Sequence, residues 1–333
     1  MPVHPQAQRI LDAGKLLSPM ETLTVAAARQ RCMDTFCTGH PPEKIRSIQD
    51  RILDLGPDLR LDAFQDLGSG PFPDRIPVRI YTPDGQAPQP VLVYFHGGGF
   101  VVNNLDTHDG ICRNLANRAG SIVVSVDYSR APEFRFPAAL LQCYKATAWV
   151  ARNAAQIGGD PHRIAVGGDS SGGTLAAGVT LMARDMGAPP VCFQLLIYPA
   201  LDDCLPGTLS YRKFSTGYSL TLAIMKWFFD HYLPGKIDKD TPYLFPARSK
   251  SLENLPGALI ITAEYDPLRD EGEEYAFRLE KAGSDVTLKR YEGMIHGFII
   301  MHRAIDRGKQ ALEEAGEFLK NRFASLGESQ GNI

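Results

Sequence analysis

Short apolar runs alternate with helix-length segments along most of this chain, from about residue 90 to residue 323. The apolar runs are continuous, as in Pro90-Val-Leu-Val-Tyr-Phe95, which is typical of a parallel strand covered on both faces. The pattern predicts strands at 90–95, 121–126, 163–167, 191–198, 257–263 and 285–291, and helices at 108–119, 137–156, 171–186, 271–282 and 303–323. Such alternation indicates an α/β fold, with a mostly parallel central sheet covered by helices on both faces.

Three regions depart from this alternation. Residues 1–45 carry apolar residues at helical spacing and end in the breaker Gly39-His40-Pro41-Pro42, so we expect helices packed on the main domain. Extended segments at about 59–67 and 76–83 have no helix between them, which predicts an antiparallel edge. Residues 203–245 contain many aromatics but no buried strand, which indicates a helical insertion. The core is then expected at 46–202 and 246–325, with a flexible tail at 326–333.

Composition excludes several classes of partner. The 333 residues carry a net charge of −3 without a long basic run, so nucleic acid is not an expected ligand. No apolar stretch approaches the roughly 20 residues that span a bilayer, and the N-terminus lacks the features of a signal peptide, which together predict a cytoplasmic protein. The six cysteines show no paired spacing, so we expect free thiols and no metal site.

The run Gly168-Asp169-Ser170-Ser171-Gly172 has the form G-x-S-x-G. This motif is weak by itself, but here it follows the predicted strand 163–167 directly and precedes a predicted helix. That strand–turn–helix setting is what a nucleophile elbow requires, because it lifts the serine hydroxyl above the ends of the strands. Ser170 is therefore the candidate nucleophile.

A second glycine-rich run, His96-Gly97-Gly98-Gly99-Phe100, follows the buried strand at 90–95. Acyl transfer places negative charge on a carbonyl oxygen, and fixed backbone N–H groups stabilise that charge. Glycines let the backbone approach a substrate closely. This loop, together with the N–H of Ser171, which follows the nucleophile, is the candidate oxyanion hole.

The candidate base follows from position along the chain, since this arrangement requires a histidine after the nucleophile and the acid. Only His231, His296 and His302 follow Ser170. His231 lies in the aromatic insertion and His302 opens the last predicted helix. His296 lies in the loop after the final strand, where a base can reach Ser170.

The candidate acid must lie between the nucleophile and the base, near the end of a strand. Asp266 follows the strand at 257–263, with Glu264 and Asp270 as close rivals and Asp202 as a more distant candidate. Asp270 and Glu271 also suit the start of the next helix, where carboxylates meet the positive end of the helix dipole. Such an acid would hold the imidazole in one tautomer and stabilise its protonated form.

These runs make the chain resemble the bacterial hormone-sensitive-lipase-like esterases, a branch of the α/β-hydrolases, from about residue 60 to 325. The resemblance rests on four motifs, which are His96-Gly-Gly-Gly-Phe100, Gly168-Asp-Ser-Ser-Gly-Gly173, Asp266-Pro-Leu-Arg-Asp-Glu-Gly272 and His296-Gly-Phe298. It implies Asp266 as the catalytic acid, and Gly98, Gly99 and Ser171 as oxyanion donors, with Gly97 as an alternative and His96 supporting the loop. It also implies that residues 1–45 and 203–245 form a cap over the pocket.

The resemblance further implies a carboxylesterase for short- or medium-chain acyl esters that needs no cofactor. Its ligand would be a small-molecule ester substrate, and since dimers are frequent in the family, the resemblance also allows a homodimer. Aromatics near the expected pocket, Phe100, Phe214, Tyr218 and Phe298, are candidates for substrate contact. An amidase, lactonase or peptidase would use the same three residues, because leaving-group preference depends on the pocket. A non-catalytic binding protein is a third reading, although no member of the catalytic set is lost.

The chain departs from the family pattern at three places. Ser171 stands where the family usually has alanine, so its hydroxyl could compete for hydrogen bonds near the oxyanion hole. Tyr128-Ser-Arg-Ala-Pro-Glu133 replaces a Tyr-Arg-Leu-Ala-Pro-Glu motif, which leaves the contacts of Arg130 open. Asn103-Asn104 stands where a glycine is frequent.

Overall fold

The computed structural model describes residues 2–37, 42–56, 72–204, 207–235 and 237–330. These residues form one eight-stranded sheet in the order β1-β2-β4-β3-β5-β6-β7-β8. Its strands are β1 (Ser47–Asp54), β2 (Arg75–Thr82), β3 (Gln89–Phe95), β4 (Ile122–Val126), β5 (Gly159–Asp169), β6 (Phe193–Ile197), β7 (Gly257–Tyr265) and β8 (Val286–Ile295). The pairs from β4 to β8 are parallel, whereas β2 pairs antiparallel with both β1 and β4. The predicted parallel sheet with an antiparallel edge is confirmed.

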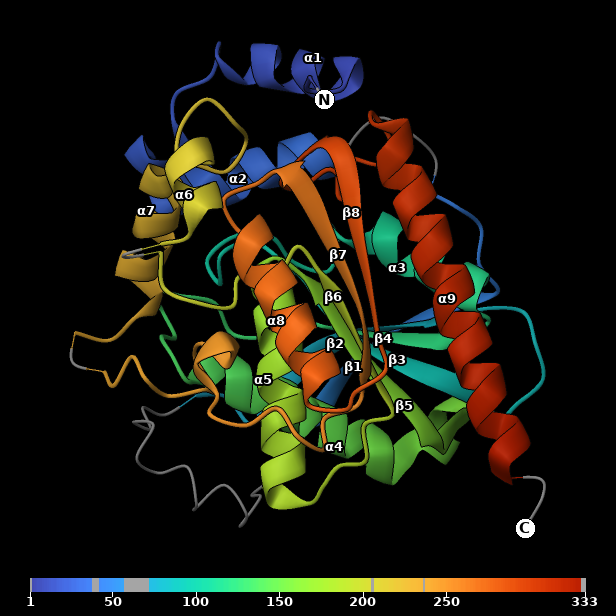
Figure 1. Ribbon diagram of the computed structural model, residues 1–333. Coiled ribbons are helices and arrows are strands. Elements are labelled where there is room, and N and C mark those ends of the chain that lie inside the picture. The colour runs from blue at the N-terminus through green and yellow to red at the C-terminus, as the bar shows by residue number, and fades with distance from the viewer. Residues whose placement is uncertain (1, 38–41, 57–71, 205–206, 236, 331–333) are drawn as a thin grey trace.

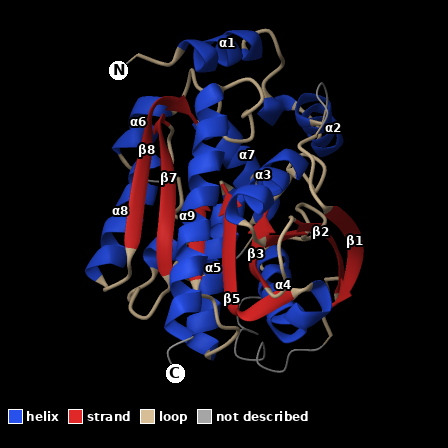
Figure 2. Cartoon of the chain, turned by 90° about the vertical axis from the view of Figure 1, so that its right-hand side faces the viewer, coloured by secondary structure: helices blue, strands red, loops and turns tan. Residues whose placement is uncertain are grey.

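Helices cover both faces of this sheet (Figures 1 and 2). They are α1 (Pro5–Gly14), α2 (Val25–Phe36), α3 (Asp109–Ala119), α4 (Ala138–Asn153), α5 (Ser171–Met186), α6 (Leu209–Phe214), α7 (Leu222–Tyr232), α8 (Arg269–Lys281) and α9 (Asp306–Gln330), with short 3-10 turns η1 (Met20–Thr22), η3 (Ala154–Ile157) and η4 (Pro246–Arg248). No helix in the part of the chain that the structure describes is both long and apolar enough to cross a membrane.

Strand β3 shows how the two layers of core arise. Every residue of β3 is buried, and successive side chains point to opposite faces. Val91, Val93 and Phe95 join one apolar cluster with residues of α4, α5 and α8. Leu92 and Tyr94 join a second cluster with residues of α3 and α9. Truncating such a core side chain to alanine typically lowers the free energy of unfolding by about 2 to 5 kcal/mol. Packing on both faces therefore holds β3, and with it the loop that follows its end, in one position.

The helices α2, α6 and α7 gather beyond the carboxyl ends of the parallel strands (Figure 1). Helix α7 packs on η1, and through this contact the insertion meets the N-terminal segment. Helix α1 instead packs at the end of β8, where the N–H of His4 donates to the carbonyl of Gly293 at 2.9 Å and Gln6 bonds Asp306 at the start of α9. The N-terminal segment therefore contacts two separate parts of the molecule.

Strand β1 was not expected from the sequence. It contains the charged residues Asp50, Arg51 and Asp54. Its neighbouring apolar residues Ile52 and Leu53 point to opposite faces, one exposed and one buried, so apolar and polar residues do not alternate along the strand. It forms because all eight of its residues pair with β2. The predicted strand at about 59–67 lies outside the described residues. The other predicted strands and helices are present, with ends shifted by a few residues.

Candidate active site

Ser170 occupies the sharp turn between β5 and α5. Its backbone has φ 54° and ψ −122°, a region that costs energy for a residue with a side chain and that marks functional turns. The turn passes so close to β3 that a Cβ on Gly172 would collide with the carbonyl group of Phe95. The sequence therefore places glycine where the packing admits nothing larger, and the serine hydroxyl stands at the carboxyl end of the sheet.

The three residues expected to form the catalytic set lie in hydrogen-bonding distance of one another. The Oγ of Ser170 is 3.1 Å from Nε2 of His296, and Nδ1 of the same ring is 2.7 Å from Oδ2 of Asp266. Asp266 is fully buried, and its other carboxylate oxygen accepts the N–H of Leu268 at 2.9 Å. The carboxylate is thus fixed at both oxygens and in turn fixes the orientation of the imidazole ring.

The other candidate histidines and acids have different partners. His231 bonds the carbonyl of Trp227 and His302 bonds that of Ile299. The rival acids accept hydrogen bonds elsewhere, Glu264 from the N–H of Gly293, Asp270 from the N–H of Ser210, and Asp202 from Arg248. Of the candidates named from the sequence, the structure brings only Asp266 and His296 together with Ser170.

The loop from His96 to Phe100, here called the oxyanion loop, passes beside Ser170. Gly98 and Gly99 have φ of 123° and 57°, conformations that glycine adopts without strain. Within the described residues, the N–H groups of Gly98 and Gly99 donate no hydrogen bond. Ser171 is the first residue of α5, so its N–H also has no intrahelical partner. Three N–H groups are therefore available to a substrate oxygen.

Gly97, the alternative donor, is already engaged. Its N–H donates to Oδ1 of Asp169 at 3.0 Å, and Nε2 of His108 lies 3.3 Å from the same nitrogen. Burial acts to raise the pKa of Asp169, but the charge of His108 and hydrogen bonds from His108, Tyr94 and Gly97 outweigh it, so this pKa lies below its ordinary value. Asp169 is therefore an anion beneath the oxyanion loop, a role that sequence reasoning missed.

His96 supports the loop from inside the protein. Its ring is fully buried, stacks on Tyr128 at 4.2 Å and contacts the carbonyl of Gly97 through Nδ1 at 2.9 Å. Burial first, and then the neighbouring His108, lower the pKa of His96 to about 3. The ring is consequently neutral at neutral pH.

Two departures from the family pattern have clear contacts. Asn103 adopts φ 68°, and its side-chain amide donates to the carbonyl of Gly97 at 3.2 Å. Arg130 donates to the carbonyl of Asn103 at 2.5 Å. Both side chains therefore hold the segment that continues from the oxyanion loop.

A cavity of about 220 Å³ opens onto Ser170 and His296. Its wall is mostly apolar and includes Phe100, as expected. The cavity also receives side chains from η1, α2 and α7, which are Met20, Cys32, Phe36, Ile224, Met225, Phe228 and Phe229. A Cβ on Gly99 would overlap the ring of Phe228, so this ring lies directly against the oxyanion loop.

Three aromatics expected in the pocket lie elsewhere. Phe214 and Tyr218 pack edge to face, and both contact the ring of Tyr265. Phe298 is fully buried between Tyr198 and Tyr291. None of the three lines the cavity at Ser170. Within the described residues, no three His, Cys, Asp or Glu side chains gather in a way that could hold a metal ion.

Known proteins share both this fold and much of this sequence. A family model described as alpha/beta hydrolase fold matches residues 92–300. Esterase LipI of Mycobacterium tuberculosis is 43% identical over 266 residues, which cover 77% of this chain and 81% of LipI. Carboxylesterase NlhH of the same organism is 38% identical over 327 residues, 94% of this chain and 96% of NlhH. The structure of the hyperthermophilic esterase from the archaeon Pyrobaculum calidifontis has a TM-score of 0.86 at 38% identity, covering 98% of this chain and all (100%) of that one.

Proposed function

This chain belongs to the α/β-hydrolase family, in its hormone-sensitive-lipase-like branch, and from that premise we propose that it is a serine carboxylesterase with Ser170 as nucleophile. The observation that carries the proposal is the continuous hydrogen-bonded chain from Asp266 through His296 to Ser170. The names of the relatives, esterase and carboxylesterase, support the same chemistry.

The geometry supports a two-step reaction. His296 accepts the Ser170 proton at Nε2 as Oγ attacks the ester carbonyl, and Asp266 stabilises the resulting imidazolium through Nδ1. The carbonyl oxygen becomes negative and receives hydrogen bonds from the N–H groups of Gly98, Gly99 and Ser171. Each such donor typically lowers the barrier by about 3 to 4 kcal/mol. His296 then returns the proton to the departing alcohol, which leaves an acyl group on Ser170.

Water completes the cycle by the same route. His296 accepts a proton from the water as it attacks the acyl-enzyme, and the regenerated Ser170 hydroxyl leaves with that proton. The carboxylic acid product is released and the enzyme returns to its starting state. No cofactor takes part in these steps.

The cavity supports short- to medium-chain acyl esters as substrates. Its volume of about 220 Å³ is below the roughly 300 to 1,000 Å³ of pockets that hold drug-sized ligands. Its apolar wall favours a hydrocarbon group over a charged one, because an unpaired charge placed there would lose its hydration.

Replacing the nucleophile tests the proposal. Ser170→Ala should lower kcat/KM for p-nitrophenyl acetate by about 10⁴-fold or more, because among the described residues Ser170 carries the only hydroxyl that bonds Nε2 of His296. An organophosphonate should label the native protein at Ser170 and leave the variant unlabelled. Full turnover by the variant would falsify the assignment. Rates on a matched ester and amide pair would separate an esterase from an amidase on the same residues.

Two expectations from the sequence stay predictions. Sedimentation of the purified protein would test the homodimer, and fractionation of the native cells would test the cytoplasmic location.

A further inference from the structure

The residues on either side of the nucleophile contact the oxyanion loop at its two ends. Asp169 precedes Ser170 and accepts the N–H of Gly97 at 3.0 Å. Ser171 follows Ser170, and its Oγ accepts the N–H of Phe100 at 3.3 Å. Gly98 and Gly99 lie between these two bonded positions.

We propose that the side chains of Asp169 and Ser171 form a clamp that positions the oxyanion loop over Ser170. This inference rests on the proposed function, since it assigns a purpose to the loop in acyl transfer. Both are positioning residues, because their side chains act through the backbone of the loop. The backbone N–H of Ser171 remains an oxyanion donor in its own right.

The hydroxyl of Ser171 has two neighbours, the backbone of the oxyanion loop and the side chain of Tyr128. Besides accepting the N–H of Phe100, it interacts with Tyr128. Burial raises the pKa of Tyr128 well above its usual range, and the Ser171 side chain opposes that shift. Tyr128 in turn donates to the carbonyl of His96 at 2.7 Å. Ser171 and Tyr128 thus contact the loop at opposite ends, at Phe100 and at His96, and the Ser171 hydroxyl makes a contact with the loop that the usual alanine would lack.

Asp169 is held more rigidly than Ser171. Tyr94 donates to its Oδ1 at 2.8 Å, and Nε2 of His108 lies 3.1 Å from the same oxygen. All these groups are buried. A buried carboxylate with several donors is costly to displace, so the end of the loop at Gly97 follows the position of Asp169.

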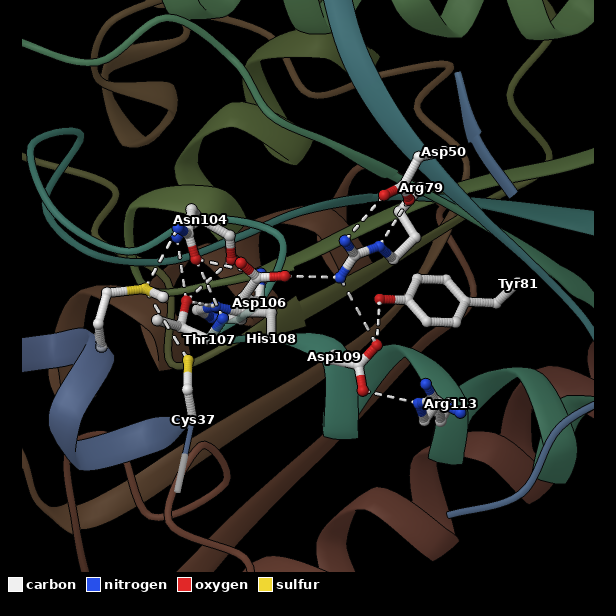
Figure 3. A network of polar contacts seen from close by, with 11 residues as sticks. Cys37, Asp50, Arg79, Tyr81, Asn104, Asp106, Thr107, His108, Asp109 and Arg113 are labelled. Atoms are coloured by element: carbon white, nitrogen blue, oxygen red, sulfur yellow. Dashed lines mark hydrogen bonds and ion pairs between the residues drawn. The ribbon is translucent and has the colours of Figure 1, made fainter. Parts of the chain in front are cut away.

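The support for Asp169 extends to the edge of the sheet (Figure 3). His108 contacts the hydroxyl of Thr107 through Nδ1 at 2.9 Å, and the turn from Asn104 to Thr107 is closed by hydrogen bonds to the Asn104 side chain. Asp106 in this turn pairs with Arg79 of β2, which also pairs with Asp50 of β1. The support for the clamp therefore reaches β1 and β2 of the sheet, and Asn104 also contacts Met33 of α2 at 3.3 Å.

The arrangement should act on the transition state more than on substrate binding. Oxyanion donors stabilise best when they lie 2.7 to 3.1 Å from the developing charge, about the range of a hydrogen bond. Because the N–H groups of Gly97 and Phe100 are engaged, those of Gly98 and Gly99 are left to face the substrate. Loosening either end displaces these donors, and an interaction made mainly in the transition state appears in kcat rather than KM.

Two variants test the clamp. Ser171→Ala keeps the backbone N–H but removes the hydroxyl, and we expect kcat for p-nitrophenyl acetate to fall about fivefold with KM unchanged. Asp169→Asn removes the charge, and we expect a fall of about 30-fold. Matched controls are Ser121→Ala, a buried serine just before β4, and Asp160→Asn, at the opposite end of β5 from Asp169. Both controls should keep native kcat.

A transition-state analogue separates positioning from general loss of structure. A trifluoromethyl ketone forms an adduct on Ser170 whose oxyanion occupies the same N–H groups, so its inhibition constant should rise by the same factor as kcat/KM falls. Inhibition by the alcohol product should not change. The clamp is overturned if both variants have the same melting temperature as the native protein and also keep its kcat and its inhibition constant for the ketone. Should Asp169→Asn fail to fold, Ser171→Ala alone decides by the same criterion. Failure of the proposed function would appear separately, as activity surviving in Ser170→Ala.

Discussion

At the scale of single residues, a second buried carboxyl group lies close to the catalytic acid. Glu271, in the first turn of α8, accepts the N–H of Leu201 at 2.7 Å and the hydroxyl of Tyr211 at 3.0 Å. Burial, and then the carboxylates of Asp202 and Asp266, raise the pKa of Glu271 well above its usual range, although its hydrogen bonds oppose the shift. The side chain was expected at the start of this helix, and in that position it also joins α8 to α6 through Tyr211.

Replacing Glu271 should change how stability depends on pH. A carboxyl whose pKa is raised by folding contributes its full stability below the unfolded pKa of about 4.5 and loses it as pH rises toward the folded value. Glu271→Gln keeps a neutral acceptor at every pH. Relative to the native protein, we therefore expect the variant to gain about 1 to 3 kcal/mol of unfolding free energy between pH 5 and pH 8.

Urea unfolding at the two pH values measures this gain. Glu280→Gln, an exposed position on the same helix, serves as the control and should show none. An equal difference between Glu271→Gln and the native protein at both pH values would contradict the argument.

The catalytic residues could be predicted from the sequence because each follows a strand in the order the fold requires. Ser170, Asp266 and His296 were all named in this way. The clamp could not be predicted, because its contacts join residues 71 and 72 positions apart and the motif that contains Asp169 and Ser171 does not show their partners. Phe214, Tyr218 and Phe298 were expected in the pocket but do not line it, since the sequence does not show which way an aromatic side chain points.

At the scale of elements, the buried parallel strands could be predicted and the edge strand β1 could not. A strand with both faces covered is apolar along most of its length, as β3 is. The edge strand β1 is partly exposed and carries charged residues, so its sequence lacks the apolar pattern by which a strand is predicted. The insertion was expected to be helical, and α6 and α7 are its helices. The direction in which α7 presents its side chains depends on packing against η1, a contact between distant segments.

Helix α7 should set the size of the group that the pocket admits. Phe228 lies half-buried against Gly99 and lines the cavity at Ser170. Phe228→Ala frees space that a longer acyl chain can fill, and each buried methylene contributes about 0.8 kcal/mol, or about fourfold in rate. We expect the ratio of kcat/KM for p-nitrophenyl octanoate to that for the acetate to rise about tenfold.

A series of p-nitrophenyl esters from acetate to octanoate checks this effect. Phe277→Ala removes an exposed phenylalanine from α8, 58% accessible, and should leave the ratio unchanged. An unaltered ratio in Phe228→Ala would show that another part of the wall limits chain length.

At the scale of the whole molecule, buried titratable groups on different elements act on one folding equilibrium. His96, on the oxyanion loop, is held neutral, and Asp169, at the end of β5, is held ionised. Both pKa values are lowered by folding, so the unfolded chain binds more protons than the folded protein as the solution becomes acidic. Glu271 acts in the opposite direction above pH 4.5, where its raised pKa favours the unfolded state. Between about pH 4.5 and 6.5, His96 makes the free energy of unfolding rise with pH, whereas Glu271 makes it fall.

The free energy of unfolding should therefore fall steeply as pH drops below this range, and His96 should account for a measurable part of that loss. Its contribution to stability is complete above the unfolded pKa of 6.5 and is lost as pH falls toward the folded value of about 3. One proton taken up by the unfolded chain across this window corresponds to a loss of about 3 kcal/mol between pH 7 and pH 4. In His96→Asn, which can still bond the carbonyl of Gly97, the fall in unfolding free energy between these pH values should be smaller by about this amount. The exposed His162→Asn variant should keep the native slope, and a native slope in His96→Asn as well would show that His96 is not the group that takes up the proton.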